Sequence, residues 1–117
     1  MTNKEIANRL VELCKAGDYE TCYKELYAQD AKSIEPRGDQ WEIIQGMEAF
    51  AAKGKEWNAT IEEFYGSTIS EPVVADDFFS LKMGMDYKNK EGQRINHSEI
   101  CVYKIENGKI VSEQFFY

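Results

Sequence analysis

Hydrophobic residues recur at two different periods along this chain, and the change divides it into a helical first half and a strand-rich second half. Near the N-terminus, Ile6, Leu10 and Leu13 recur every three or four residues, the period of an amphipathic helix. Thr2 and Glu5 have the spacing of a capping box. We therefore expect this helix to begin after Thr2 and to end at Gly17.

The pattern predicts two further helices and one short strand before residue 60. Asp18 caps the second helix, whose apolar stripe is Tyr19, Cys22, Tyr23 and Leu26. The third helix follows Gly46, with helical spacing at Met47, Phe50, Ala51, Gly54 and Trp57. Between them, residues 31–35 predict a strand that Pro36 stops, followed by a loop over residues 37–39.

From residue 61 onward the pattern is typical of strands. We expect them over residues 61–69, 78–87, 94–105 and 110–117, with a possible short edge strand over 73–75. The turn Glu-Asn-Gly-Lys at 106–109 joins the last two strands into a hairpin. Helices followed by an antiparallel meander favour an α+β fold, with three helices packed on one face of a curved antiparallel sheet.

The closing hairpin carries apolar side chains on both of its faces. Alternation places one set of side chains together: His97, Glu99, Cys101, Tyr103 and Ile105. Ile100 and Val102 lie on the opposite face. Three short helices can cover only one side of the sheet, and an uncovered apolar patch is rare in monomers. We therefore expect a homodimer that forms through the outer face of the sheet.

Composition and charge narrow the class of protein. A chain of 117 residues has the length of one domain, so we expect a single domain over residues 1–117. The net charge of −7 argues against a nucleic-acid partner and against an anionic membrane surface. No apolar run approaches a membrane span, and the polar N-terminus is unlike a signal peptide. Three cysteines without metal-type spacing favour reduced thiols in a cytoplasmic protein.

The sequence predicts no metal and no cofactor. It has one histidine, no histidine–carboxylate motif, no glycine-rich phosphate loop and no nucleophile elbow. Aromatic residues are numerous enough to build the walls of a pocket as well as a core, and Tyr27, Trp41 and Trp57 are candidates. Met83 and Met85 alternate on one strand face and suit either a core or an apolar ligand.

Two helices and three sequence segments, in this order, carry a resemblance to a known family. Two helices are followed by the segments ELYAQDAKSIEP, IIQGMEAFAAK and EICVYKIENGKIVSEQFFY. This order resembles the SnoaL-like branch of the nuclear transport factor 2-like superfamily over essentially the whole chain. The resemblance implies a cone-shaped α+β fold, a deep apolar cavity between helices and sheet, and frequent dimers. The superfamily includes polyketide cyclases, ketosteroid isomerases, dehydratases and epoxide hydrolases, and also members without catalysis, so the fold does not select one function.

The resemblance places one carboxylate at a functional position. Ketosteroid isomerases have their general base just before a proline that ends the first strand, and Glu35 stands in that place before Pro36. Desolvation at the mouth of an apolar cone would raise the pKa of such a carboxyl. The alternative is that Glu35 is a loop carboxylate that caps backbone amides.

The positions that stabilise the oxyanion in ketosteroid isomerases carry different residues in this chain. The tyrosine of those enzymes falls on Leu10, and their acid falls near Cys101, which we interpret as a buried packing thiol in the pocket wall beside Tyr103. Glu99 and His97 remain on the same strand face. A carboxylate within an apolar strand is either paired or functional. A strand histidine is either an acid–base group or a hydrogen-bonded residue at the rim.

Two hypotheses follow from these residues. The first is a domain that binds a small apolar ligand between helices and sheet and lacks the acid pair of the isomerases and cyclases. The alternative is a cofactor-free isomerase, cyclase or hydrolase that acts on a small apolar carbonyl or polyketide-like substrate. In that alternative Glu35 is the general base, and Glu99 or His97 assists it.

Overall fold

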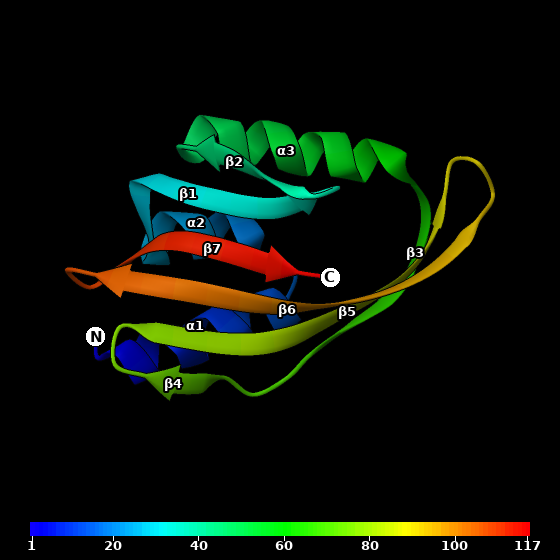
Figure 1. The fold of residues 1–117 in the computed structure, drawn as a ribbon. Helices are drawn as coiled ribbons and strands as arrows, with labels where there is room; N and C mark the ends of the chain where they lie inside the picture. The colour runs from blue at the N-terminus through cyan, green and yellow to red at the C-terminus, as the bar shows by residue number, and fades with distance from the viewer.

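The computed structural model describes all 117 residues, and it confirms the α+β cone with three helices on a curved sheet (Figure 1). The first half contains α1 (Asn3–Lys15), α2 (Tyr19–Leu26), β1 (Tyr27–Arg37), β2 (Gln40–Gln45) and α3 (Met47–Thr60). The second half contains β3 (Ile61–Ile69), β4 (Val73–Ala75), β5 (Phe78–Asn89), β6 (Arg94–Glu106) and β7 (Lys109–Phe116).

The local signals for the first two helices are confirmed. At the start of α1, the Thr2 hydroxyl accepts a hydrogen bond from the backbone N–H of Glu5, and the Glu5 carboxylate accepts one from the backbone N–H of Thr2. At the start of α2, the Asp18 carboxylate accepts from the backbone N–H of Thr21. These caps satisfy N–H groups that have no partner within their own helix.

The sheet is mixed, so the prediction of a purely antiparallel sheet is corrected. Its strand order is β2-β1-β7-β6-β5-β3, and β4 adds to β5 at one edge. β1 and β7 are parallel neighbours, with Ser33 opposite Glu113, whereas all other pairs are antiparallel. The reason is that the chain leaves β1 through β2 and α3, builds the β3–β6 side of the sheet, and only then returns beside β1 (Figure 1).

The first strand is longer than the sequence predicts, and a strand was missed after it. β1 continues through Pro36 to Arg37 and forms a hairpin with β2, in which Pro36 lies opposite Trp41. Pairing with β7 ends at Ile34, so Pro36 lies where β1 has only β2 as a neighbour. Proline is tolerated in a strand at such edge positions because it has no N–H to donate to a second neighbour.

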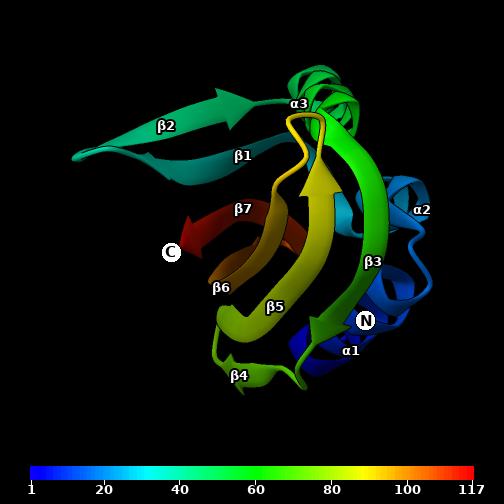
Figure 2. The ribbon, with the colours of Figure 1, turned by 90° about the vertical axis from the view of Figure 1, so that its right-hand side faces the viewer.

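One hydrophobic core lies between the helices and the concave face of the sheet (Figure 2). The apolar stripe of α1 contributes Ile6, Leu10 and Leu13, all buried. On β6 the predicted inward set is confirmed, since Cys101, Tyr103 and Ile105 are buried. Ile100, on the opposite face, is exposed. The hairpin alternation therefore identified the face of the sheet that the helices cover.

A carboxyl group lies inside this core. Glu113 on β7 is only 6% exposed. The Tyr27 hydroxyl donates to its Oε1 over 2.5 Å, and the Ser33 hydroxyl donates to its Oε2 over 2.7 Å. Burial raises the pKa of Glu113, because a charged carboxylate is poorly solvated in the core, although both hydrogen bonds oppose this shift.

The buried carboxyl makes the stability of the fold depend on pH. Above the ordinary pKa of 4.5, the unfolded chain releases the Glu113 proton while the folded chain still holds it. The free energy of unfolding therefore falls as pH rises from 4.5 through the raised folded pKa. In Glu113→Gln this loss is absent, so chemical denaturation of both proteins from pH 4 to pH 8 should show the variant gaining stability relative to the native protein as pH rises. A difference that is constant across this range would contradict the raised pKa.

Candidate functional site

The concave face of the sheet is built from rows of cross-strand neighbours that become more exposed toward one end. The deepest row that crosses four strands contains Phe79, Tyr103, Glu113 and Ser33, all of them buried. The next row contains Leu81, Cys101 and the partly exposed Phe115. Two further rows follow on β5 and β6, Met83 with Glu99 and Met85 with His97. We call these last four residues the open end of the concave face.

The second half of α3 lies over the rows beyond the core. Phe50 is the one buried residue of this helix. One turn later, the Lys53 ammonium lies 5.0 Å from the ring centre of Phe115. Trp57 packs edge-on against Tyr87 of β5 with 5.7 Å between ring centres. The second half of the helix therefore contacts the sheet through these two long side chains, and its other residues are exposed.

A connected set of polar side chains runs from the core to the surface beneath α3. Lys53 Nζ donates to Ser33 Oγ over 2.9 Å and lies 3.0 Å from Glu35 Oε2. The side chains of Lys53 and Glu35 are 33% and 27% exposed, whereas Ser33 and Glu113 are buried. Lys53 thus connects the buried Glu113, through Ser33, to the more accessible Glu35.

A second pair lies at the open end. His97 Nε2 is 3.3 Å from Glu99 Oε2, and the Cys101 thiol makes a long contact of 3.9 Å with Glu99 Oε1. The His97 ring also packs edge-on against Tyr117. The Glu99 side chain is only 8% exposed, and burial raises its pKa, opposed by His97. The negative charge of Glu35 raises the pKa of Glu99 further, so the two carboxyl groups are electrostatic neighbours.

The structure brings the three predicted catalytic candidates to the same side of the sheet. Glu35, Glu99 and His97 all lie on the concave side, at or next to its exposed rows. Glu35 is paired with a lysine rather than with backbone amides. Their catalytic roles remain predictions, but their common location agrees with the alternation on which two of them were chosen.

The seven predicted pocket residues fall into three groups. Three are fully buried in the core, where they pack against other side chains: Tyr27, Cys101 and Tyr103. Three lie at or beside the open end with part of their surface exposed: Trp57, Met83 and Met85. The remaining residue, Trp41, is on the convex face, where its ring packs against Phe116 at 5.4 Å. The prediction for Trp41 is therefore corrected, because the missed strand β2 turns this side chain away from the helices.

Sequence reasoning missed two charged residues of the polar set, although both had a signal. Lys53 is three residues after Phe50 and four before Trp57, which places a lysine on the apolar stripe of α3. Glu113 is two residues before Phe115, so the alternation that singled out Glu99 on β6 applies equally to Glu113 on β7.

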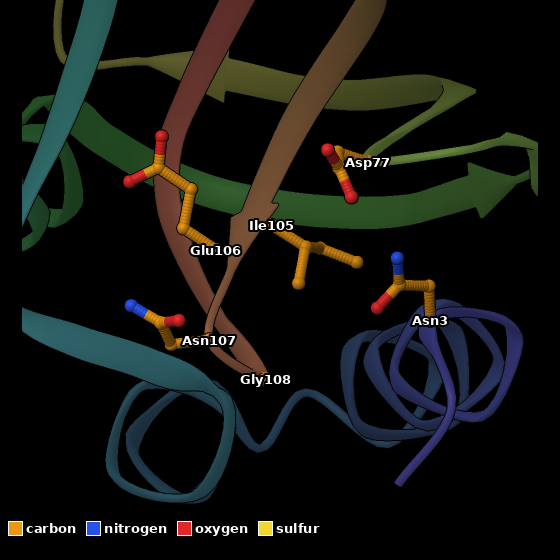
Figure 3. Close-up of a pocket in the computed structure, with 6 residues that line it drawn as sticks. All are labelled: Asn3, Asp77, Ile105, Glu106, Asn107 and Gly108. Atoms are coloured by element: carbon orange, nitrogen blue, oxygen red, sulfur yellow. The ribbon is translucent and has the colours of Figure 1, made fainter.

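Two surface cavities lie away from the open end. One, of about 350 Å³, is lined by residues of the N-terminus, the segment before β5 and the β6–β7 turn, as Figure 3 shows: Asn3, Asp77, Ile105, Glu106, Asn107 and Gly108. The other, of about 380 Å³, lies between the end of α3 and the β5–β6 turn. None of the predicted site residues lines either cavity.

Two further features of the structure bear on the class of site. No group of three or more histidine, cysteine, aspartate or glutamate side chains is arranged to hold a metal ion. No helix has the length and apolar character that crossing a membrane would require.

Comparison with known proteins agrees with the fold and its family. A family model described as a SnoaL-like domain matches residues 1–117. A search among curated proteins gives no match. The crystal structure of a putative SnoaL-like polyketide cyclase from Mesorhizobium loti is 33% identical, with 100% of each chain covered and a TM-score of 0.91.

More distant structures share the fold. An NTF2-like protein of unknown function from Burkholderia pseudomallei is 16% identical, with 100% of this chain and 92% of that chain covered and a TM-score of 0.80. TerC, co-crystallised with polyporic acid, is 10% identical, with 97% and 88% covered and a TM-score of 0.77. The match of the whole chain to one family model, with full-length identity of 33% to a solved relative, shows that this protein belongs to the SnoaL-like domain family.

Proposed function

We propose that this SnoaL-like domain binds a small, largely apolar molecule at the open end of the concave face, beneath the second half of α3. The observation that carries the proposal is that Met83 and Met85 remain partly exposed beside two polar pairs, under a helix segment that buries none of its own residues. Ligand sites typically combine such apolar surface with a few convergent polar groups.

The side chains at this site suit an apolar ligand with one or two polar atoms. Methionine is flexible and polarisable, so Met83 and Met85 can adapt to the shape of a bound molecule. Trp57, Tyr87 and Phe115 add aromatic surface above and beside them. A relative with the same fold, TerC, was co-crystallised with polyporic acid, which supports a ligand-binding role for this architecture.

The two tryptophans offer a direct test, because Trp57 lies beside the proposed site and Trp41 lies on the convex face. In Trp41→Phe, addition of 1-tetralone should shift the single indole N–H signal in a heteronuclear NMR spectrum, and the shift should saturate. In the matched variant Trp57→Phe, the remaining Trp41 signal should not move. A shift confined to Trp41, or no saturable shift in either variant, would refute binding at this place.

A second candidate function is proton abstraction next to a carbonyl group, with Glu35 as the general base. It is favoured by the presence of Glu99, a second carboxyl group on the same side of the sheet whose pKa is raised by burial. A carboxyl group that stays neutral can donate a hydrogen bond to a developing oxyanion, while an ionised one removes the proton. Isomerases, cyclases and hydrolases that act on carbonyl compounds all use such groups to move protons.

Hydrogen–deuterium exchange separates catalysis from binding alone. If Glu35 is a base, the protein should accelerate exchange of the α-protons of 1-tetralone in D₂O above the buffer rate, measured by proton NMR. Glu35→Gln should lower this acceleration by about 100-fold or more, the usual contribution of a general base. Glu42→Gln, on β2 opposite Glu35 and paired with Arg37, is the matched control and should retain the rate. Exchange at the buffer rate in the native protein would leave binding as the function.

We also propose that a second copy of the chain covers the convex face. Exposed apolar residues lie together there on β2, β6 and β7: Trp41, Ile43, Ile100 and Phe116. Trp41 contacts Phe116, and Phe116 is the cross-strand neighbour of Ile100, so the patch is continuous. A two-fold axis through this patch would place the same apolar residues opposite each other, which suits an isologous dimer.

Light scattering at micromolar concentration tests the dimer. The native protein should have twice the mass of the 13.5 kDa chain, and Ile100→Asp should be monomeric because it would bury a charge at the centre of the interface. Phe64→Asp is the matched control. Phe64 is similarly exposed but lies on the concave face, where Tyr87 is its cross-strand neighbour. A monomeric native protein would contradict the proposal.

A further inference from the structure

We infer that Lys53 binds a carbonyl oxygen of the ligand, and that the buried residues Ser33 and Glu113 hold it in position to do so. This inference rests on the ligand site proposed above. It supplies an oxygen-binding group in place of the isomerase tyrosine and acid, whose positions are Leu10 and Cys101 in this chain. The residues of that group come from three elements that are far apart in the sequence, α3, β1 and β7.

The hydrogen bonds of the Lys53 ammonium leave one donor free. A lysine ammonium has three N–H groups. One is directed to Ser33 Oγ at 2.9 Å, and a second is accounted for by Glu35 Oε2 at 3.0 Å. The protein provides no further oxygen acceptor for Nζ, and the side chain is one-third exposed. The third N–H is therefore accessible to a ligand oxygen.

The direction of that donor is fixed from within the core. Ser33 donates its single hydroxyl proton to Glu113 Oε2 at 2.7 Å, so its oxygen must act as an acceptor toward Lys53. Glu113 is itself held by the Tyr27 hydroxyl at its other oxygen. A hydroxyl without this carboxyl partner would be free to rotate and compete for other acceptors. Glu113 and Ser33 are thus positioning residues for the Lys53 ammonium.

The surrounding charges favour a neutral carbonyl over an anionic group. Glu35 already balances the charge of Lys53, and the carboxyl groups of Glu99 and Glu113 lie within its electrostatic reach. An added carboxylate would be repelled by Glu35 and would find the charge of Lys53 already balanced, whereas a carbonyl oxygen accepts the free N–H without adding charge. Phe115, whose ring lies 5.0 Å from Nζ, gives the apolar remainder of the ligand a surface beside this donor.

A ketone and its parent hydrocarbon test the assignment of Lys53. Binding of 1-tetralone and of tetralin is measured by the NMR shift of the Trp57 indole in the Trp41→Phe protein. The protein with Lys53 should prefer 1-tetralone, and Lys53→Met should lose about tenfold or more of the affinity for 1-tetralone while its affinity for tetralin is retained. Lys53→Arg keeps a charged donor, so it should recover part of the preference for the ketone.

The positioning role has a spectroscopic readout of its own. In 1-tetralone labelled with carbon-13 at the carbonyl, a hydrogen bond from the ammonium should move the carbonyl resonance downfield on binding. Ser33→Ala and Glu113→Gln should reduce this displacement while tetralin still binds. Ser112→Ala, the neighbouring serine on β7 that lies opposite Lys32, is the matched control and should leave the displacement unchanged.

Each part of the inference has a result that overturns it. Equal affinity for 1-tetralone and tetralin, or an unchanged preference in Lys53→Met, would exclude Lys53 as the oxygen-binding group and leave the proposed site intact. A full carbonyl displacement in both Ser33→Ala and Glu113→Gln would exclude the positioning role. If Lys53→Met does not fold, loss of the preference in Ser33→Ala supports the inference and its retention opposes it. Failure of both compounds to bind the Trp41→Phe protein would instead refute the proposed function itself.

Discussion

The carboxyl group of Glu113 is the more deeply buried of the two buried carboxyl groups, and its hydrogen bonds join the first strand to the last. Tyr27 and Ser33, both from β1, donate to its two oxygens, so that the parallel strands β1 and β7 are joined by side chains as well as by backbone hydrogen bonds. No buried side-chain nitrogen or oxygen atom is left without a hydrogen-bond partner. The core therefore tolerates a group whose burial would otherwise be costly.

The same group links the core to the exposed end of the concave face. Ser33 contacts both Glu113 and Lys53, and Lys53 contacts Glu35, so a polar path crosses from a fully covered row to a partly open one. The apolar side chains change in parallel, from tightly packed rings to flexible methionines. Members of one fold family can keep the first kind of row for stability and vary the second kind for function.

The sequence predicts the local elements of this fold well, because helix caps and alternation are local signals. The capping box at Thr2 and the inward face of β6 are both found as predicted. The strand at 40–45 was missed because only Ile44 of QWEIIQ packs against the core, and its apolar residues Trp41, Ile43 and Ile44 do not alternate. The parallel pairing of β1 with β7 was missed because it joins segments about 80 residues apart and has no local pattern.

In the candidate site, too, the features with a local sequence signal were predicted and those that depend on distant segments were not. Glu99 and His97 were found because they alternate with apolar residues on one strand. Lys53 and Glu113 each had a local signal, but their meaning depends on Ser33, which stands between them only in the folded chain. A position on an apolar stripe can be identified from the sequence, whereas the hydrogen-bond partner that makes a buried carboxyl group acceptable cannot.

The parallel contact between β1 and β7 also determines when the site can form during folding. The hairpins β1–β2 and β5–β6 contain only local contacts, but β1 remains without its inner neighbour until residues 112–114 arrive beside residues 32–34. Contacts of such sequence separation form slowly because a long loop must close first. Until then, Glu113 lacks Tyr27 and Ser33, and Ser33 lacks the carboxyl group that orients it. Assembly of the polar path is therefore expected to be among the last events on the folding pathway, after most of the helical and hairpin structure is already in place.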